Sequence, residues 1–266
     1  MRKADLGAAA AAMFVIAGAT PAVAQQVDEA EAISFTDTIP QTQLQAMIEQ
    51  GGRLFNGGTC IICHAVGARG DGRRGPNLTD EEWLHSEGDF EGIMETVRWG
   101  VKRSEMKAMT PRPFQMNPNG GMSISFPEVM ALSAYVWSRV NGVAPEGVAR
   151  QDEVLAMLED GDIGGATDAL RADARARPDS LIFTERAVNL LGYEYLQRWN
   201  SPETAIELFL FNAETHPESW NTWDSLGEGY AALGETRQAI EMYEKALELN
   251  PRSTSAAEAL EQLRSR

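Results

Sequence analysis

The chain has 266 residues, of which 43% are hydrophobic, so it can bury packed cores and is not disordered as a whole. Acidic residues outnumber basic ones by 39 to 23, and the isoelectric point is near 4.6, which disfavours a nucleic-acid partner. Two cysteines and a mean hydropathy of −0.30 exclude a disulfide-stapled scaffold and a polytopic membrane protein. The length predicts about two domains.

The first 24 residues have the pattern of an export signal peptide. Arg2 and Lys3 precede an apolar run over residues 6–19, and the Ala-Val-Ala of residues 22–24 is typical of a cleavage site. A bilayer span takes about 20 apolar residues, so this run is too short to be an anchor. We therefore predict cleavage after Ala24 and a periplasmic mature chain without a membrane span.

Composition divides the mature chain further. Helical periodicity begins at Thr42, and a stretch rich in Gly and Pro near residues 141–147 marks a boundary. Residues 143–266 carry a net charge of −12, against −5 for residues 25–142. The expected organisation is a flexible acidic segment at 25–40, a first domain at 41–142, a linker at 143–151 and a second domain at 152–266.

The second domain repeats with a period of 34 residues. The unit at 220–252 resembles the tetratricopeptide repeat at all eight signature positions, which are Trp223, Leu226, Gly227, Tyr230, Ala239, Tyr243, Ala246 and Pro251. A degenerate copy precedes it, and residues 152–178 add half a copy. The resemblance implies about two and a half helical hairpins in a short solenoid that docks another protein. The alternative is an array that only caps or solubilises the first domain.

Both cysteines lie in Cys60-Ile61-Ile62-Cys63-His64, the spacing used for covalent attachment of haem c. On a helical turn, positions i and i+3 share a face, so both thiols reach one porphyrin and His64 presents its imidazole to the iron. The alternatives are a redox thiol pair, a structural disulfide and half of a zinc site. The redox pair lacks a βαβ context, and zinc would need two more ligands where only His85 and His216 remain as histidines.

Residues 42–142 resemble class I c-type cytochromes, which carry one haem. Beyond the haem motif, the resemblance rests on Gly51 and Phe55, on Gly75-Pro76-Asn77-Leu78, and on the segment Pro127 to Val140 with Tyr135. It implies an all-α domain whose first and last helices cross at Gly51. It also implies that the carbonyl of Pro76 accepts a hydrogen bond from His64.

The second axial ligand has several candidates. The segment Met116-Asn117-Pro118-Asn119-Gly120-Gly121 is similar to the Met-Pro-x-x-Gly-Gly turn of bacterial cytochromes c, so we expect Met116 to bind the iron. Met109 is the second choice, and Met122, Met106 and His85 remain alternatives. A thioether opposite an imidazole raises the reduction potential and leaves no open position for a substrate, which favours electron transfer over enzymatic catalysis.

Basic residues gather in the segments expected around the haem, despite the acidic total. They are Arg69, Arg73, Arg74, Arg98, Lys102, Arg103, Lys107 and Arg112. They are either solvated loop residues or a positive rim that pairs with haem propionates and guides an acidic partner. Trp83 and Trp99 are expected in the haem pocket or in the core.

These patterns predict an exported electron carrier. The first hypothesis is a periplasmic cytochrome with one haem c that carries single electrons between redox partners of the dehydrogenase or terminal oxidase kind. Its repeats would dock it to a partner whose identity the sequence does not contain. The alternative is a haem-bearing scaffold or sensor in which the repeats provide the main activity and the sixth ligand is displaceable.

Overall fold

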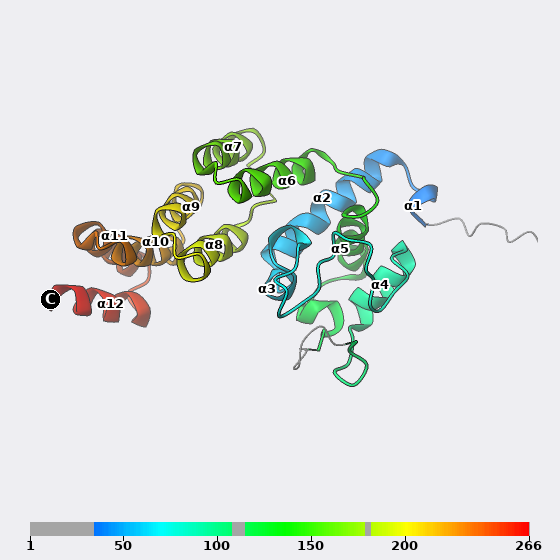
Figure 1. Cartoon of the computed structure of the whole chain (residues 1–266), viewed down its shortest axis with the longest axis horizontal. Coiled ribbons are helices and arrows are strands. Elements are labelled where there is room, and N and C mark those ends of the chain that lie inside the picture. Colours follow the sequence, from blue (N-terminus) through cyan, green and yellow to red (C-terminus); the bar gives the residue numbers. More distant parts are fainter. Residues whose placement is uncertain (1–34, 108–114, 179–181, 266) are drawn as a thin grey trace, which may run out of the picture. The chain divides into compact units, whose positions relative to one another are not determined.

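The computed structural model describes residues 35–107, 115–178 and 182–265 (Figure 1). These residues form helices and loops, with an isolated antiparallel bridge between Val101 and Met116, so the all-α prediction is confirmed. Among the described helices, none is long and apolar enough to cross a membrane. The predicted signal peptide at 1–24 lies outside the described residues.

The first part of the chain folds as helices around the Cys60–His64 segment. They are α1 (Phe35–Thr38), α2 (Gln41–Gly57), α3 (Cys60–His64), η1 (Val66–Ala68), α4 (Phe90–Trp99), η2 (Pro118–Gly121) and α5 (Phe126–Ser138). Helix α1 lies inside the segment 25–40 that we expected to be flexible. It is held because the Phe35 ring stacks on Phe90 at 5.3 Å and the Phe35 N–H donates to Glu91 Oε1.

Helices α2 and α5 cross at a very close contact. A Cβ atom at Gly51 would stand 1.9 Å from the carbonyl oxygen of Ala131, so only glycine permits this approach. The Phe55 and Tyr135 rings, both fully buried, pack beside the crossing at 5.2 Å. Helix α5 begins with a capping box, in which the N–H and the hydroxyl of Ser125 both donate to Glu128 Oε2. The predicted crossing is present in the structure.

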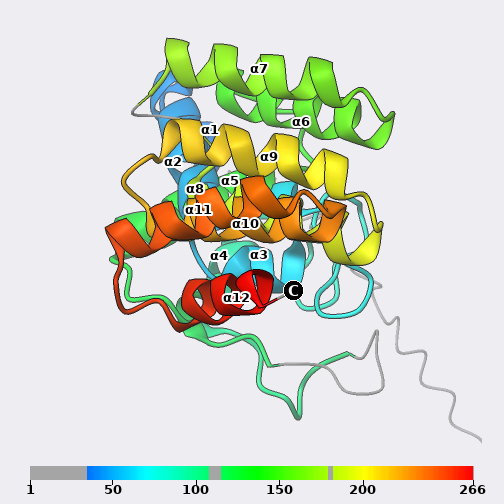
Figure 2. The ribbon, with the colours of Figure 1, turned by 90° about the vertical axis from the view of Figure 1, so that its left-hand side faces the viewer.

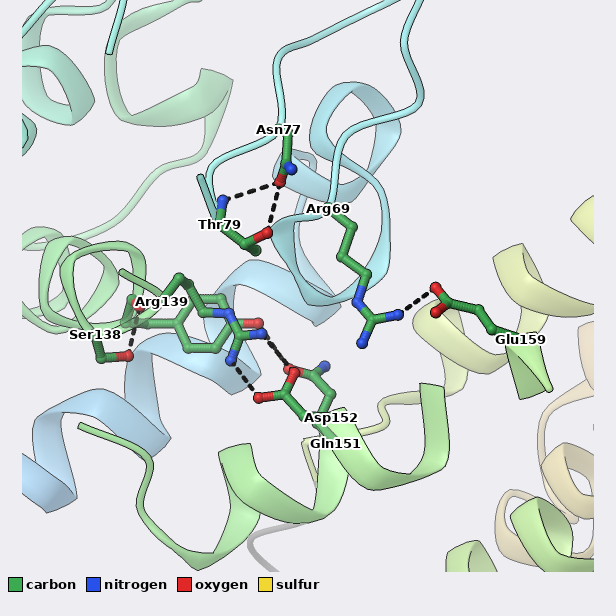
Figure 3. A network of polar contacts seen from close by, with 9 residues as sticks. Arg69, Asn77, Thr79, Ser138, Arg139, Gln151, Asp152 and Glu159 are labelled. Carbon is green, nitrogen blue, oxygen red and sulfur yellow. Dashed lines mark hydrogen bonds and ion pairs between the residues drawn. The ribbon is translucent and has the colours of Figure 1, made fainter. Parts of the chain in front are cut away.

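The segment 143–151 is not the linker that the sequence predicted, because helix α6 (Glu146–Glu159) begins within it. Val148 and Gln151 share one helix face and are buried, and Gln151 Oε1 accepts from the Tyr135 hydroxyl at 2.7 Å. Arg139 donates two hydrogen bonds to the Asp152 carboxylate (Figure 3). Gly and Pro before Glu146 therefore mark a turn into a packed helix.

The remaining helices form successive hairpins. They are α7 (Ile163–Ala176), α8 (Glu185–Tyr193), the π-helical turn η3 (Glu194–Arg198), α9 (Pro202–Thr215), α10 (Trp220–Leu233), α11 (Thr236–Leu249) and α12 (Thr254–Arg264). Helices α9, α10, α11 and α12 lie side by side in chain order (Figure 2). The turn η3 lies inside the degenerate repeat, and Asn200, two residues after η3, has a φ of 50°.

The last repeat packs through small residues facing a large ring. A Cβ atom at Gly227 would stand 2.9 Å from the Tyr243 ring, so α10 and α11 approach across a glycine. Ala239 and Ala246 are fully buried in the same contact. These side chains occupy the places that the repeat resemblance predicted for them.

One hydrophobic core joins the first helices to the early repeats. It includes Ile48 of α2, Val154 of α6, Leu170 of α7 and Leu208 of α9. A hydrogen bond from the Thr184 hydroxyl to the Asn56 carbonyl, at 2.7 Å, adds a direct link between the start of α8 and the end of α2. The first helices and the early repeats therefore share one packed core.

We expect Asp152→Ala to lower the free energy of unfolding by about 1–2 kcal/mol, after allowing for the partial exposure of this carboxylate. The reason is that Arg139, whose side chain is 6% exposed, loses its charged acceptor. The matched control Glu153→Ala removes an exposed ion pair with Arg150 and should cost less than about 0.5 kcal/mol. Urea unfolding followed by helical circular dichroism measures both, and equal effects would contradict the packing of α6.

Candidate haem-binding site

A cavity of about 390 Å³ opens between α3, α4, α5 and the loops that follow α3 and α4. Its walls are largely apolar, and the larger side chains among them are Phe55, Leu78, Trp83, Ile93, Leu132 and Val136. Such walls favour a flat apolar ligand and exclude water from its face. Trp83 therefore lies on the cavity wall, which is one of its two predicted locations.

Cys60 and Cys63 lie one turn apart on α3, and both side chains line the cavity. Burial raises the pKa of the Cys60 thiol to about 11, and burial, followed by the nearby Asp71 carboxylate, raises the pKa of Cys63. A catalytic redox pair needs a thiol whose pKa is lowered. The surroundings of these two cysteines therefore do not favour the redox-pair alternative.

His64 is held in a fixed orientation at the end of α3. Its Nδ1 atom lies 3.0 Å from the carbonyl oxygen of Pro76, which is the contact expected from the sequence. In the tautomer that donates this bond, Nε2 keeps its lone pair for a metal. Burial lowers the pKa of His64, which favours the neutral, metal-binding form of the ring. Phe55 packs 6.4 Å from the imidazole and connects it to the α2–α5 crossing.

The candidate sixth ligands occupy different places. Met116 and Met106 line the cavity, whereas Met122 packs over Gly58, where a Cβ atom would meet its sulfur at 2.2 Å. Met109 lies outside the described residues. His85 also lines the cavity, but its Nε2 accepts a 3.4 Å bond from the Lys107 amide, which occupies that lone pair.

The loop that carries Met116 is tied to its surroundings at two points. The Met116 backbone pairs with Val101 through hydrogen bonds of 2.8 and 3.0 Å, and the Thr59 hydroxyl donates to the Gly120 carbonyl at 2.5 Å. Thr59 thus joins the start of α3 to the methionine loop. The sequence analysis missed this residue because its partner is 61 positions away and no local pattern reveals the contact.

The predicted basic rim is only partly realised. Arg74 is the one member of the predicted set that lines the cavity within residues 35–107 and 115–178. Arg69 instead pairs with Glu159 of α6 (Figure 3), and Lys102 pairs with Glu105. Arg112 lies outside the described residues.

Both predicted locations of Trp99 are wrong. Its side chain is 65% exposed and lies in neither the core nor the cavity. The Arg98 guanidinium stacks over the Trp99 ring and over Phe126, which is 51% exposed. Trp99 ends α4, and its ring faces outward because the chain turns immediately at Gly100.

The side chains around the cavity fit a haem of the c type. Two thiols at helical spacing, an imidazole whose Nδ1 is anchored on a carbonyl, and a methionine thioether on the same cavity are the donor set of such a group, and Met106 and Met116 are the described candidates for the thioether. Cys60, Cys63 and His64 would hold it on the α3 side. Within the described residues, no cluster of three or more His, Cys, Asp or Glu side chains is arranged to hold a bare metal ion, which leaves the zinc alternative unsupported.

Comparison with known families agrees with this architecture. A family model described as cytochrome c matches residues 48–139, and a family model described as tetratricopeptide repeat matches residues 220–253. The chain therefore contains a cytochrome c domain followed by a tetratricopeptide repeat, as the sequence predicted.

No curated protein matches the chain. Among solved structures, it is similar to the first tetratricopeptide repeat domain of Spaghetti (RPAP3), determined with the HSP90 peptide SRMEEVD. The identity is 16% and the TM-score is 0.32, and the match covers 46% of this chain and 94% of the other.

We expect Cys60→Ser and Cys63→Ser each to leave at most one thioether bond, and the double variant to leave none, because the chain has no other cysteine. The mass of the denatured chain measures the attachment directly. A double variant that still carries porphyrin through denaturation would refute the assignment of these thiols. Haem staining after denaturing electrophoresis gives an independent readout.

Proposed function

We propose that this chain is an exported cytochrome with one haem c that carries single electrons between redox proteins, and that its repeats dock it to one of them. The observation that carries the proposal is the joint placement of Cys60, Cys63 and His64 on one apolar cavity, with Nδ1 of His64 on the Pro76 carbonyl. The cytochrome c domain supports electron transfer in general, and the repeat supports protein interaction.

When bound, a haem would supply a one-electron couple between ferrous and ferric iron. The chain's own residues set the conditions for it. Cys60 and Cys63 would hold it covalently, His64 would bind the iron with its ring orientation fixed by the Pro76 carbonyl, and Met116 would supply a thioether ligand. Phe55 and Leu132 exclude water from the cavity, so little solvent reorganises when the charge changes.

Access for a partner follows from the exposure around α3. Ile62, between the two cysteines, is 41% exposed, and Cys63 is half-buried whereas Cys60 is more enclosed. The Cys63 side is therefore the side at which a redox partner approaches. Arg74 lines the cavity and donates to the Ile62 carbonyl at 3.3 Å, and its guanidinium is paired with the Asp71 carboxylate at 3.7 Å.

The periplasm is the proposed location. Its support is the signal-like pattern of residues 1–24 together with the haem attachment motif, since both belong to a chain processed outside the cytoplasm. The electron donor and acceptor are proposed only as redox proteins. Both axial positions are proposed to be filled, so the role does not include catalysis on a small substrate.

We expect Met116→Ala to abolish the weak red absorption band of the iron–thioether bond and to let ferrous haem bind carbon monoxide, because the sixth position is vacated. The matched control is Met106→Ala, which changes the other described methionine on the same cavity. Optical spectra of the purified haem protein measure both effects.

A band that survives in Met116→Ala and disappears in Met106→Ala would transfer the ligand assignment. Ready carbon monoxide binding by the unmodified protein would contradict the electron carrier and favour the haem sensor, since a carrier keeps its sixth ligand.

A further inference from the structure

Helix α10 carries two carboxylates that form no ion pair with any of the described residues. Asp224 and Glu228 are four residues apart and therefore share a helix face, where like charges destabilise each other. Asp224 is only 5% exposed, and Glu228 is half-buried. The ion pairs within the described part of the repeats involve other carboxylates. This arrangement lowers the stability of the repeats unless something outside them compensates the charge.

The buried carboxylate also has an unused acceptor atom. Oδ2 of Asp224 accepts from the Ser255 hydroxyl at 3.0 Å, but Oδ1 has no hydrogen-bond partner among the described residues. Asn189 stands at the equivalent place on α8, 35 residues earlier, the same offset that relates Gly192 to Gly227. Its Oδ1 is likewise buried without a partner. Two neighbouring repeats therefore each lack a hydrogen-bond donor at the same position.

Aromatic hydroxyls surround these groups. The Tyr193 hydroxyl of α8 lies 3.1 Å from Ser225 Oγ of α10, which brings the two helices into contact. Burial, and then the charge of Glu228, raises the pKa of Tyr243. Burial also raises the pKa of Tyr193; the Ser225 hydrogen bond opposes this, and the charges of Glu228 and Asp224 add to it. We call Asn189, Tyr193, Asp224 and Glu228 together the acidic face.

The acidic face lies on α8 and α10, which together with α12 are the first helices of successive hairpins. Tyr193 bonds Ser225 across α8 and α10, and Ser255 bonds Asp224 across α12 and α10. The exposed Glu258 of α12 stands one 34-residue period beyond Asp224 and extends the negative charge. An extended chain laid across these helices would meet acidic or acceptor groups on each of them.

The class of ligand that would supply the missing hydrogen-bond donor follows from the charge and the groups present. An anionic ligand is excluded by the two carboxylates and by the net charge of −12 over residues 143–266. A hard divalent cation takes six or more oxygen ligands, and no group of three or more metal-binding side chains exists among the described residues. A lysine or arginine side chain brings several N–H donors and a positive charge, and its cation also fits against tyrosine rings.

We propose that the acidic face binds a lysine or arginine side chain of an extended segment of a partner protein. This inference rests on the proposed docking role of the repeats and specifies the charge of what they dock. The occupant is a basic segment because two buried acceptor atoms without a donor, Asp224 Oδ1 and Asn189 Oδ1, coincide with two carboxylates that form no ion pair among the described residues.

The test measures fluorescence anisotropy of two labelled nonapeptides with the haem-loaded full chain. One peptide alternates Lys with Ala, and the other alternates Glu with Ala. We expect the unmodified protein to bind the Lys peptide, and Asp224→Asn with Glu228→Gln to weaken this binding about tenfold or more. The control variant Glu241→Gln with Glu248→Gln makes the same charge change at exposed positions of α11 and should bind within about twofold of the unmodified protein.

A second readout separates a binding role from a structural one. The Asp224→Asn, Glu228→Gln variant should unfold at a higher temperature than the unmodified protein without peptide, since it removes uncompensated charge. If that variant does not fold, Glu228→Gln alone, at a half-buried position, retains the peptide test.

The inference is overturned if the unmodified protein fails to bind the Lys peptide, or if the control variant loses binding to the same extent. Preference for the Glu peptide would preserve the docking role and overturn the charge assignment. The haem spectrum of the same samples tests the electron carrier separately, because the acidic face is remote from Cys60, Cys63 and His64 in the chain.

Discussion

The close crossing of α2 and α5 is the constraint on which the haem site depends. Because Gly51 has no side chain, the α2 backbone reaches the Ala131 carbonyl, and the Phe55 and Tyr135 rings are buried against each other. Phe55 then packs beside His64, whose other contact is the Pro76 carbonyl. The ring that is proposed to bind iron is thus positioned from two sides, by helix packing and by one hydrogen bond.

Helix α6, at the start of the second half of the chain, contacts the same crossing. Tyr135 offers its ring to Phe55 and its hydroxyl to Gln151, and Arg139, one turn later, holds Asp152. A residue pair on α5 therefore connects the surroundings of the haem site to α6. Helix α6 is thus attached to α5 through Gln151 and Asp152.

Helix α10 has a close packing contact on one face and uncompensated negative charge on another. Gly227 under the Tyr243 ring gives α10 and α11 a close, well-packed contact. On another face of α10, Asp224 and Glu228 form no ion pair with the part of the chain that the structure describes, and Asp224 Oδ1 has no hydrogen-bond donor there. These like charges lower the stability of the repeats, whereas a bound basic segment would compensate them.

Local patterns in the sequence were sufficient for the haem attachment motif, the α2 and α5 helices and the last repeat. Each depends on spacing within a helix or between successive hairpins, which the order of residues specifies directly. Tertiary structure alone decided that α6 packs on α5, that Trp99 faces solvent and that Met122 lies over Gly58. Those outcomes depend on which surfaces meet across long separations, and neither composition nor local periodicity encodes a partner dozens of residues away.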